Sequence, residues 1–231
     1  MYSATISADI ISYTSLKELE RRKLEKSIQQ LIKELAELYK GEKFFGRLIQ
    51  GDYIEFAMDS PVHSLRIALL LKAFIKSFSL DRIEKTTTKL KHFNEHGIRF
   101  ALAVAPLDTL DPENGIIDGE AIYLSGREIK KYSTSNKQKV VIKNTMYFCS
   151  PNKKMENEFD VILALLDTIF SKFSSKQSEV IYYKLLGYSE KEIATKLDKY
   201  QSTISQHSTS AGWISIEKAV NYFENYFNHA Y

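Results

Sequence analysis

The sequence predicts an α+β domain in residues 1–150 and an all-α domain with a helix-turn-helix in residues 151–231. In the first part, strand-like and helix-like patterns follow the order β-α-β-β-α-β. This order is typical of a ferredoxin-like fold, with an antiparallel sheet and helices on one face. In the second part only helical periodicity is found, and residues 175–213 carry the capping and spacing signals of short helices. The sequence therefore predicts two domains of different class.

The elements of the first part are predicted from hydrophobic period and turn residues. Leucines and isoleucines recur at helical spacing over residues 15–39, and Gln50-Gly51 between two apolar runs is a hairpin signal. Pro61 is typical of a helix start, whereas residues 80–96 show no clear period. In chain order we expect a strand at 2–11, a helix at 15–39, hairpin strands at 44–49 and 53–58, a helix at 61–78, a strand at 98–105, a loop at 106–118, a helix at 120–132 and a strand at 139–142.

The second part is expected to begin with a linker at 150–154 and a helix at 156–173, which leads into three packed helices. Ser189 and Glu192 form an S-x-x-E capping box for a helix at 190–197. Asp198 is suited to the left-handed conformation of a turn, and Ser202 is expected to cap the next helix, at 203–211. The apolar residues expected to pack these helices together are Val180, Ile181, Leu185, Ile193, Leu197 and Ile204, with Ala194 at the close crossing.

The last of these three helices is the candidate DNA-reading helix, because hydroxyl and amide side chains can contact base edges. The predicted DNA contacts are Ser202, Thr203, Ser205, Gln206 and His207, with Lys199 beside them. Phosphate binding depends on cations, yet residues 151–231 carry ten acidic residues against nine lysines. Binding by one copy should therefore be weak, and a homodimer is expected. The alternative is a helical tail that only packs on its neighbour or dimerises.

Composition excludes several classes of protein. A net charge of +3 over 231 residues does not by itself demand a nucleic-acid partner. The single cysteine, Cys149, excludes a disulfide framework within one chain. No signal-peptide pattern precedes the first predicted strand, and no apolar run approaches the roughly 20 residues that span a bilayer. We expect a cytoplasmic protein without a membrane partner.

Two acidic residues are candidate metal ligands. Asp9 lies inside the first predicted strand and Asp52 lies at the tip of the hairpin, and the predicted strand order brings these two elements together. A close carboxylate pair favours a hard cation such as Mg²⁺ or Mn²⁺ between them. The phosphates of a nucleotide would complete the coordination, with Arg127 as the balancing positive charge. The alternative is that Asp52 is a turn residue and Asp9 is buried against a backbone amine or a lysine.

Several motifs resemble those of class III nucleotidyl cyclases. The stretch DIISYTSL at residues 9–16 looks like the cyclase D-I-x-G-F-T-x-L opening, Gly51-Asp52 looks like the second metal-site G-D, and residues 119–127 have the spacing of G-x-x-V-N-x-x-x-R. A similarity over nearly the whole chain is to the SatD family, which shares a G-D hairpin, a strand like Ile98-Arg99-Phe100 and a D-G-x-A segment like residues 118–121. That family also ends in a helix-turn-helix that resembles residues 173–213, including the step Ala211-Gly212-Trp213. The resemblance implies a cyclase-like first domain, with Asp9 and Asp52 as metal ligands and Arg127 steadying the transition-state phosphate, joined to a DNA-binding module.

The chain departs from the cyclase pattern at the positions that select the nucleotide. Tyr123 replaces the ribose-orienting asparagine, Leu48 replaces the base-reading lysine, and Ile116 stands near the position of its partner aspartate. Arg47 is one residue away from the lysine position, which on a strand places it on the other face. Each missing hydrogen-bond partner costs roughly 1–3 kcal/mol, so ordinary adenine- or guanine-selective cyclisation is not expected.

Three functions follow in order of preference. The first is a transcriptional regulator whose cyclase-like domain binds a ligand or serves oligomerisation, and the second is a metal-dependent nucleotide-processing enzyme that uses Asp9, Asp52 and Arg127. The third is a scaffold in which neither domain binds a ligand. The i, i+4 pair His92 and His96 is interpreted as solvent-facing, because Gly97 ends the element at once and no HExxH motif accompanies it.

Overall fold

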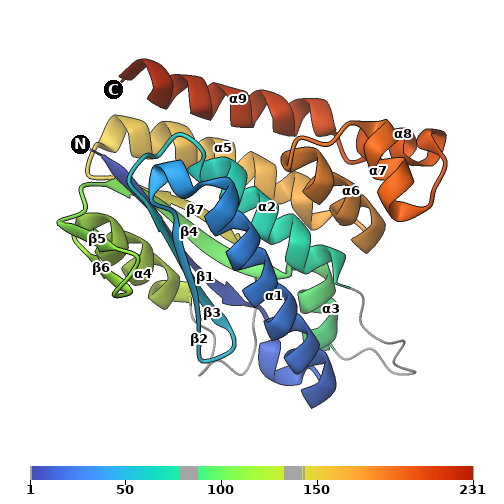
Figure 1. Cartoon of the computed structure of the whole chain (residues 1–231), viewed down its shortest axis with the longest axis horizontal. Helices are drawn as coiled ribbons and strands as arrows, with labels where there is room; N and C mark the ends of the chain where they lie inside the picture. Colours follow the sequence, from blue (N-terminus) through green and yellow to red (C-terminus); the bar gives the residue numbers. More distant parts are fainter. Residues whose placement is uncertain (1, 79–87, 133–141, 143, 231) are drawn as a thin grey trace.

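The computed structural model of the chain describes residues 2–78, 88–132, 142 and 144–230. Within these residues the protein is a mixed α/β structure with a five-stranded sheet, a small two-stranded sheet and nine α-helices (Figure 1). In chain order the elements are β1 (Ser3–Ile10), α1 (Glu18–Leu38), β2 (Phe45–Ile49), β3 (Tyr53–Met58), α2 (Ser64–Ser77), α3 (Thr88–His96), β4 (Ile98–Ala105), β5 (Thr109–Asp111), β6 (Ile116–Asp118), α4 (Glu120–Tyr132), β7 (Met146–Cys149), α5 (Lys153–Ser171), α6 (Ser175–Leu185), α7 (Glu190–Leu197), α8 (Gln201–Ser210) and α9 (Trp213–Ala230).

The large sheet has the strand order β2-β3-β1-β4-β7. β1 is antiparallel to both β3 and β4, whereas β4 and β7 are parallel. The expectation of a purely antiparallel sheet is therefore wrong at one edge, because a crossover through α4 returns the chain in the direction of β4. The last strand was expected at 139–142; residues 139–141 lie outside the described part, and β7 begins four residues after Ile142. The predicted loop at 106–118 contains the short β5–β6 pair.

The two faces of the sheet differ in polarity because side chains of β1 alternate. Ala4, Ile6, Ala8 and Ile10 belong to the main hydrophobic cluster together with α1 and α2. The intervening residues point to α4, whose Ser125 hydroxyl lies 3.1 Å from the hydroxyl of Thr5 and 2.8 Å from that of Ser7. Helices thus cover both faces of the sheet, and the expectation that they lie on one face is corrected.

α2 is a central helix, apolar on nearly all sides. Eleven of its residues are buried, and it packs between the sheet and the C-terminal helices, chiefly α6. A helix that is apolar all round is stable in this position because every side meets a neighbour. Its Lys72 is fully buried, and the ammonium is held by Thr145 Oγ1 at 2.6 Å and by Asp167 of α5 at 3.4 Å. This ion pair ties α2 to α5.

The two parts of the chain share one hydrophobic core. Ile181 and Leu185 of α6 and Phe223 of α9 belong to the same cluster as the apolar side of β1. The aromatic rings of α9 pack on α5, with 4.8 Å between the ring centroids of Phe159 and Phe223. α5 begins at Lys153 rather than at 156, because the Asn152 side chain accepts the backbone N–H groups of the first turn. None of the helices in the described part is both long and apolar enough to cross a membrane.

A second, smaller cluster holds α6, α7 and α8 together as a three-helix unit. It consists of Val180, Ile193, Ala194 and Ile204, all four of which were predicted to pack these helices. Ile181 and Leu185 were also predicted to pack these three helices together, but they belong to the main hydrophobic cluster with α2. One side of α6 packs in the main cluster and the other side, with Val180, packs in the smaller cluster.

Local signals around α7 are as predicted, whereas the start of α8 is not. Ser189 Oγ accepts the Glu192 N–H and the Glu192 carboxylate accepts the Ser189 N–H, so the capping box is present. Asp198 adopts the left-handed conformation, with φ 51°. α8 begins at Gln201 after Tyr200, so Ser202 lies inside the helix and does not cap it.

Candidate functional site

A row of side chains across four strands forms the floor of the candidate site. Asp9 of β1 is paired with Tyr53 of β3 on one side and with Arg99 of β4 on the other. Tyr53 is in turn paired with Ile49 of β2. Directly paired residues project to the same face of a sheet, so all four lie on the side of α4. This placement follows from the alternation that sends the apolar residues of β1 to the opposite side.

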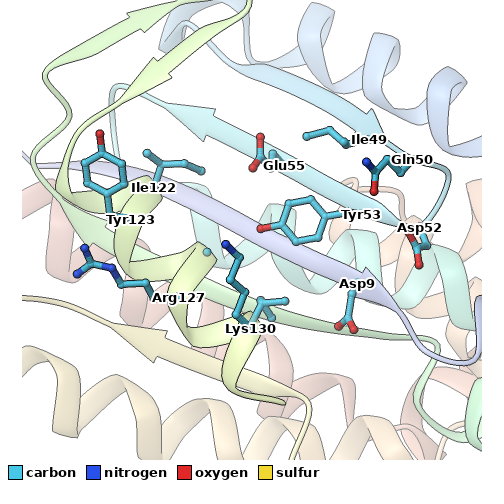
Figure 2. A pocket seen from close by; sticks show the side chains of 12 residues that line it. Asp9, Ile49, Gln50, Asp52, Tyr53, Glu55, Ile122, Tyr123, Arg127 and Lys130 are labelled. Atoms are coloured by element: carbon cyan, nitrogen blue, oxygen red, sulfur yellow. The ribbon is translucent and has the colours of Figure 1, made fainter. Parts of the chain in front are cut away.

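A pocket of about 650 Å³ lies between this row and α4. Figure 2 shows Asp9 and Asp52 at one end of it and Tyr123 with Arg127 at the other, while Lys130 extends between them toward Tyr53. The pocket therefore has an acidic end built by the sheet and a basic side built by one helix. Its lining residues are Asp9, Ile49, Gln50, Asp52, Tyr53, Glu55, Ile122, Tyr123, Gly126, Arg127, Ile129 and Lys130.

The β2–β3 turn sets the position of Asp52. Gln50 and Gly51 both have positive φ, 52° and 83°, as expected for a tight hairpin turn. The Asp52 carbonyl accepts the N–H of Ile10 at 2.9 Å, which fixes the turn against the end of β1. A Cβ at Gly51 would lie 2.6 Å from the Tyr13 hydroxyl, so glycine is required here for space as well as for φ. The turn thereby delivers the Asp52 carboxylate to the strand that carries Asp9.

The two carboxylates are electrostatically coupled. Burial raises the pKa of Asp9 to about 6, the Arg99 guanidinium opposes this shift, and the negative charge of Asp52 adds to it. Burial also raises the pKa of Asp52. Asp9 Oδ1 and Arg99 Nε form an ion pair at 3.2 Å, but neither atom has a hydrogen-bond partner within the described part of the chain. Among the described residues Arg99 is the cation that has an ion pair with Asp9, and no ion pair is found for Asp52, so the acidic end carries negative charge when both carboxylates are ionised.

This arrangement fits a hard divalent cation. Mg²⁺ and Mn²⁺ prefer carboxylate oxygens, and the Asp9 carboxylate, which has an ion pair with Arg99 but no hydrogen bond at Oδ1 among the described residues, could supply one. Glu55 also lines the pocket, but its carboxylate is held 2.7 Å from the Arg47 guanidinium. A bound cation would hold phosphate oxygens at the acidic end and leave the rest of an anionic ligand beside Lys130 and Arg127.

The structure qualifies what the sequence indicated about these residues. Asp9, Asp52 and Arg127 do line one pocket, but Arg127 points away from the carboxylates (Figure 2). Lys130 was not predicted from the sequence, yet it lies nearer to the carboxylates than Arg127 does. Its position one turn after Arg127, on the same helical face, could have indicated that it lines the same pocket. Arg99 was also missed, since its pairing with Asp9 depends on strand register.

The nucleotide-selecting positions are arranged differently from the cyclase pattern. Leu48 packs against the main core and faces away from the pocket. Arg47 and Leu48 lie on opposite faces of β2, as predicted, but it is Arg47 rather than Leu48 that lies on the pocket side. Its guanidinium is already engaged by Glu55 and by the Gly115 carbonyl at 3.0 Å. Tyr123 lines the pocket and donates its hydroxyl to Asp118, whereas Ile116 is exposed on β6 outside the lining.

A separate polar surface is presented by α8 at the end of the molecule opposite to α4 (Figure 1). We call it the α8 surface: the predicted contacts Ser202, Thr203, Ser205, Gln206 and His207, together with Lys199. Lys199, Ser202 and Gln206 are exposed and the other three are half-buried, so none is covered by the sheet or by α2. Tyr200 beside them is 84% exposed. The helix buries only Ile204 and Ser208.

The interpretation of His92 and His96 as solvent-facing is wrong for His96. His96 is buried against Lys72 and Lys76, and burial together with the positive charge of Lys72 lowers its pKa to about 4. His92 is half-buried. Gly97 does end the helix at once, as the sequence indicated, but the chain then enters β4 and α3 packs against α2.

Comparison of the chain with protein-family models, with characterised proteins and with solved structures finds no significant match. The function must therefore be argued from the two surfaces themselves.

Proposed function

We propose that this protein is a DNA-binding transcriptional regulator in which α7 and α8 form a helix-turn-helix and the first part binds a phosphorylated ligand with a divalent cation. The observation that carries the proposal is the α8 surface. A three-helix unit with its own hydrophobic cluster holds a helix whose outward side chains are hydroxyls and amides. Three residues separate α7 from α8, the length of turn typical of this motif.

In this proposal α8 enters the major groove. Gln206 pairs with an adenine edge, Ser202, Thr203, Ser205 and His207 contact neighbouring bases, and Lys199 contacts a phosphate. The scarcity of cations around α8 limits the affinity of one copy, so two copies bind together as a homodimer. The near balance of ten acidic residues and nine lysines in residues 151–231 supports this second requirement.

The order β2-β3-β1-β4 in residues 1–105 supports a ferredoxin-like arrangement for the first part, and the motif positions support its kinship with nucleotidyl cyclases and the SatD family. The pocket beside Asp9 and Asp52 is the ligand site in this proposal. Mg²⁺ or Mn²⁺ binds the two carboxylates, and Lys130 and Arg127 contact the anionic groups of the ligand. A nucleotide fits this chemistry.

The proposal is tested by selecting duplexes from a random DNA library with the full chain and sequencing them. We expect enrichment of a defined motif, arranged as two half-sites if the protein dimerises. The double variant Ser202→Ala with Gln206→Ala should lose the motif while remaining folded. Lys199→Ala should weaken binding to all sequences and reduce the salt slope by about one. Selection that returns no motif, or the same motif with the double variant, would contradict the proposal.

A second function is supported by the convergence of Asp9, Asp52 and Arg127 on one pocket. In this alternative the protein is a metal-dependent nucleotide-processing enzyme, with the cation activating the phosphate and Arg127 turning inward onto the ligand. Incubation with the four nucleoside triphosphates and Mg²⁺ or Mn²⁺, followed by chromatography of the products, tests it. Asp52→Asn should abolish turnover, and turnover that is indifferent to this change would exclude the assignment.

A further inference from the structure

The C-terminal turn of α3 brings three metal-ligating side chains together, outside both surfaces described above. His92, Glu95 and His96 each offer one donor atom, and these atoms all lie within 4.8 Å of one another. The two imidazole rings are stacked, with centroids 6.3 Å apart, and His96 Nε2 lies 3.7 Å from Glu95 Oε1. Positions i, i+3 and i+4 share one helical face, so a regular helix holds the three groups side by side.

Two of these groups have unsatisfied polar atoms. The Nδ1 atoms of both His92 and His96 are buried, and neither has a hydrogen-bond partner among the residues that the structure describes. Buried polar atoms are nearly always paired, because an unpaired one keeps the full cost of its desolvation. Two such atoms on adjacent turns, beside a carboxylate, indicate that a partner is needed at this place.

The backbone around the cluster is held firmly. The Gly97 N–H donates to the Phe93 carbonyl at 2.7 Å, and the Gly97 carbonyl accepts the N–H of Ile11 at 3.0 Å. The Lys76 ammonium donates to the carbonyl oxygens of Asn94 and Glu95. It is therefore engaged by the backbone, and among the described residues the Glu95 carboxylate has no ion pair with it.

We infer that His92, Glu95 and His96 form a binding site for a transition-metal ion of the Zn²⁺ class. Two imidazole nitrogens and one carboxylate oxygen are the donor set of many such sites, and water completes the coordination. A hard ion such as Mg²⁺ prefers oxygen ligands, so this site and the Asp9–Asp52 pocket select different metals. The positive charges of Lys72 and Lys76 oppose a cation here; Asp167 compensates that of Lys72, and we expect moderate affinity.

Occupation of this site would strengthen the corner where α3 meets β4. Gly97 follows His96 directly and bonds to Ile11, one residue beyond the strand that carries Asp9. A metal ion that binds the folded chain and not the unfolded chain raises the apparent stability by mass action. The site would therefore stabilise the support of the carboxylate pocket without taking part in it.

The test is equilibrium dialysis and visible absorption of the untagged full chain, freed of metal and titrated with Zn²⁺ or Co²⁺. We expect one bound ion, Co²⁺ bands characteristic of low coordination number and a rise in melting temperature with Zn²⁺. His92→Gln, at a half-buried position, should weaken binding at least tenfold, and Glu95→Gln should weaken it less. His229→Gln, at an exposed position on α9, and Asp52→Asn should leave this affinity unchanged within twofold.

Several outcomes would overturn the inference. Absence of saturable Zn²⁺ or Co²⁺ binding is one of them. Binding that His92→Gln leaves intact is another, and binding that Asp52→Asn abolishes would assign the ion to the pocket. Circular dichroism of each variant ensures that a loss of binding is not a loss of fold.

Discussion

The pocket and the α8 surface are built in opposite ways. The pocket collects residues from β1, the β2–β3 turn, β3 and α4, which are up to about 120 positions apart in the chain. The α8 surface comes from one short segment, residues 199–207, and depends on three helices that follow one another directly. The pocket is thus a product of sheet register, whereas the α8 surface is a product of local sequence.

The two regions also differ in charge. The acidic end of the pocket carries two coupled carboxylates whose pKa values are raised, so it responds to protons and cations. The α8 surface carries hydroxyl, amide and imidazole groups and one lysine, so in the proposed function it should respond to DNA sequence and to salt. The difference teaches that the two regions lie apart and differ in chemistry, so in the proposed function an ionic ligand and DNA would not compete for one site.

The largest effect is expected from Ile204→Ala, which removes a fully buried side chain from the small cluster. Loss of packing should cost about 2–5 kcal/mol in the three-helix unit and abolish DNA binding. Mn²⁺ binding in the pocket should persist if the two regions are independent. Ile214→Ala, at a residue 66% exposed, is the control and should leave both properties unchanged. Urea denaturation with DNA- and Mn²⁺-binding assays measures these effects. Loss of Mn²⁺ binding in Ile204→Ala would show that the pocket and the α8 surface are not independent.

Gly51→Ala should weaken Mn²⁺ binding in the pocket and leave DNA binding unchanged, the opposite of what is expected for Ile204→Ala. A side chain at φ 83° costs about 1–2 kcal/mol, and the new Cβ would meet the Tyr13 hydroxyl. The turn must shift, so Asp52 moves away from Asp9 and Mn²⁺ binding weakens while DNA binding is retained. Gly41→Ala, where nothing lies within 4 Å of the added Cβ, is the matched control. Isothermal titration with Mn²⁺ measures the change; unaltered affinity would show that the turn does not set the site.

The Mn²⁺ affinity of the pocket should depend on pH, because it involves a carboxylate with a raised pKa. Because the folded-state pKa of Asp9 is raised to about 6, protons compete with the cation, and Mn²⁺ affinity should fall up to tenfold per pH unit below pH 6. Without a cation, the raised pKa means that the free energy of unfolding decreases as pH rises from about 4 through 6. Asp9→Asn should reduce this slope and leave the part that the raised pKa of Asp52 contributes. The Asp9 carboxylate is surrounded by other charged or titratable groups, namely Arg99, Asp52, Tyr53 and Lys130. The parent chain is therefore measured in parallel, so that the difference between the two chains reports on Asp9. A flat Mn²⁺ affinity between pH 5 and 7 would contradict the account.

Much of the three-helix unit could be predicted because its signals are local. The capping box of Ser189 and Glu192 and the left-handed Asp198 are each decided within four residues of sequence. Ile193 and Ile204 lie eleven residues apart, but each follows from the helical spacing of apolar residues in its own short helix. The predicted start of α8 is two residues too late. Tyr200 takes the N-cap position without a side-chain hydrogen bond, so no capping residue in the sequence marks this start.

The pocket could be predicted only in outline. The strand order was enough to bring Asp9 and Asp52 together, since both lie on neighbouring central elements. The partner of Asp9 could not be found, because Arg99 is placed by the pairing register of β1 with β4. The position and direction of β7 could not be predicted for a related reason. The strand is only four residues long, and a short apolar run does not indicate which edge of a sheet it joins.

The central claim is that α8 reads DNA, and the affinity of the Gln206→Ala variant tests it most directly. Fluorescence anisotropy with a duplex selected by the parent chain gives this affinity at fixed salt. We predict a loss of at least fivefold, since one base contact contributes about 1–3 kcal/mol, and no loss for Asn225→Ala, an exposed amide on α9. Equal affinity of the parent chain and Gln206→Ala, or an equal loss in both variants, would contradict the claim.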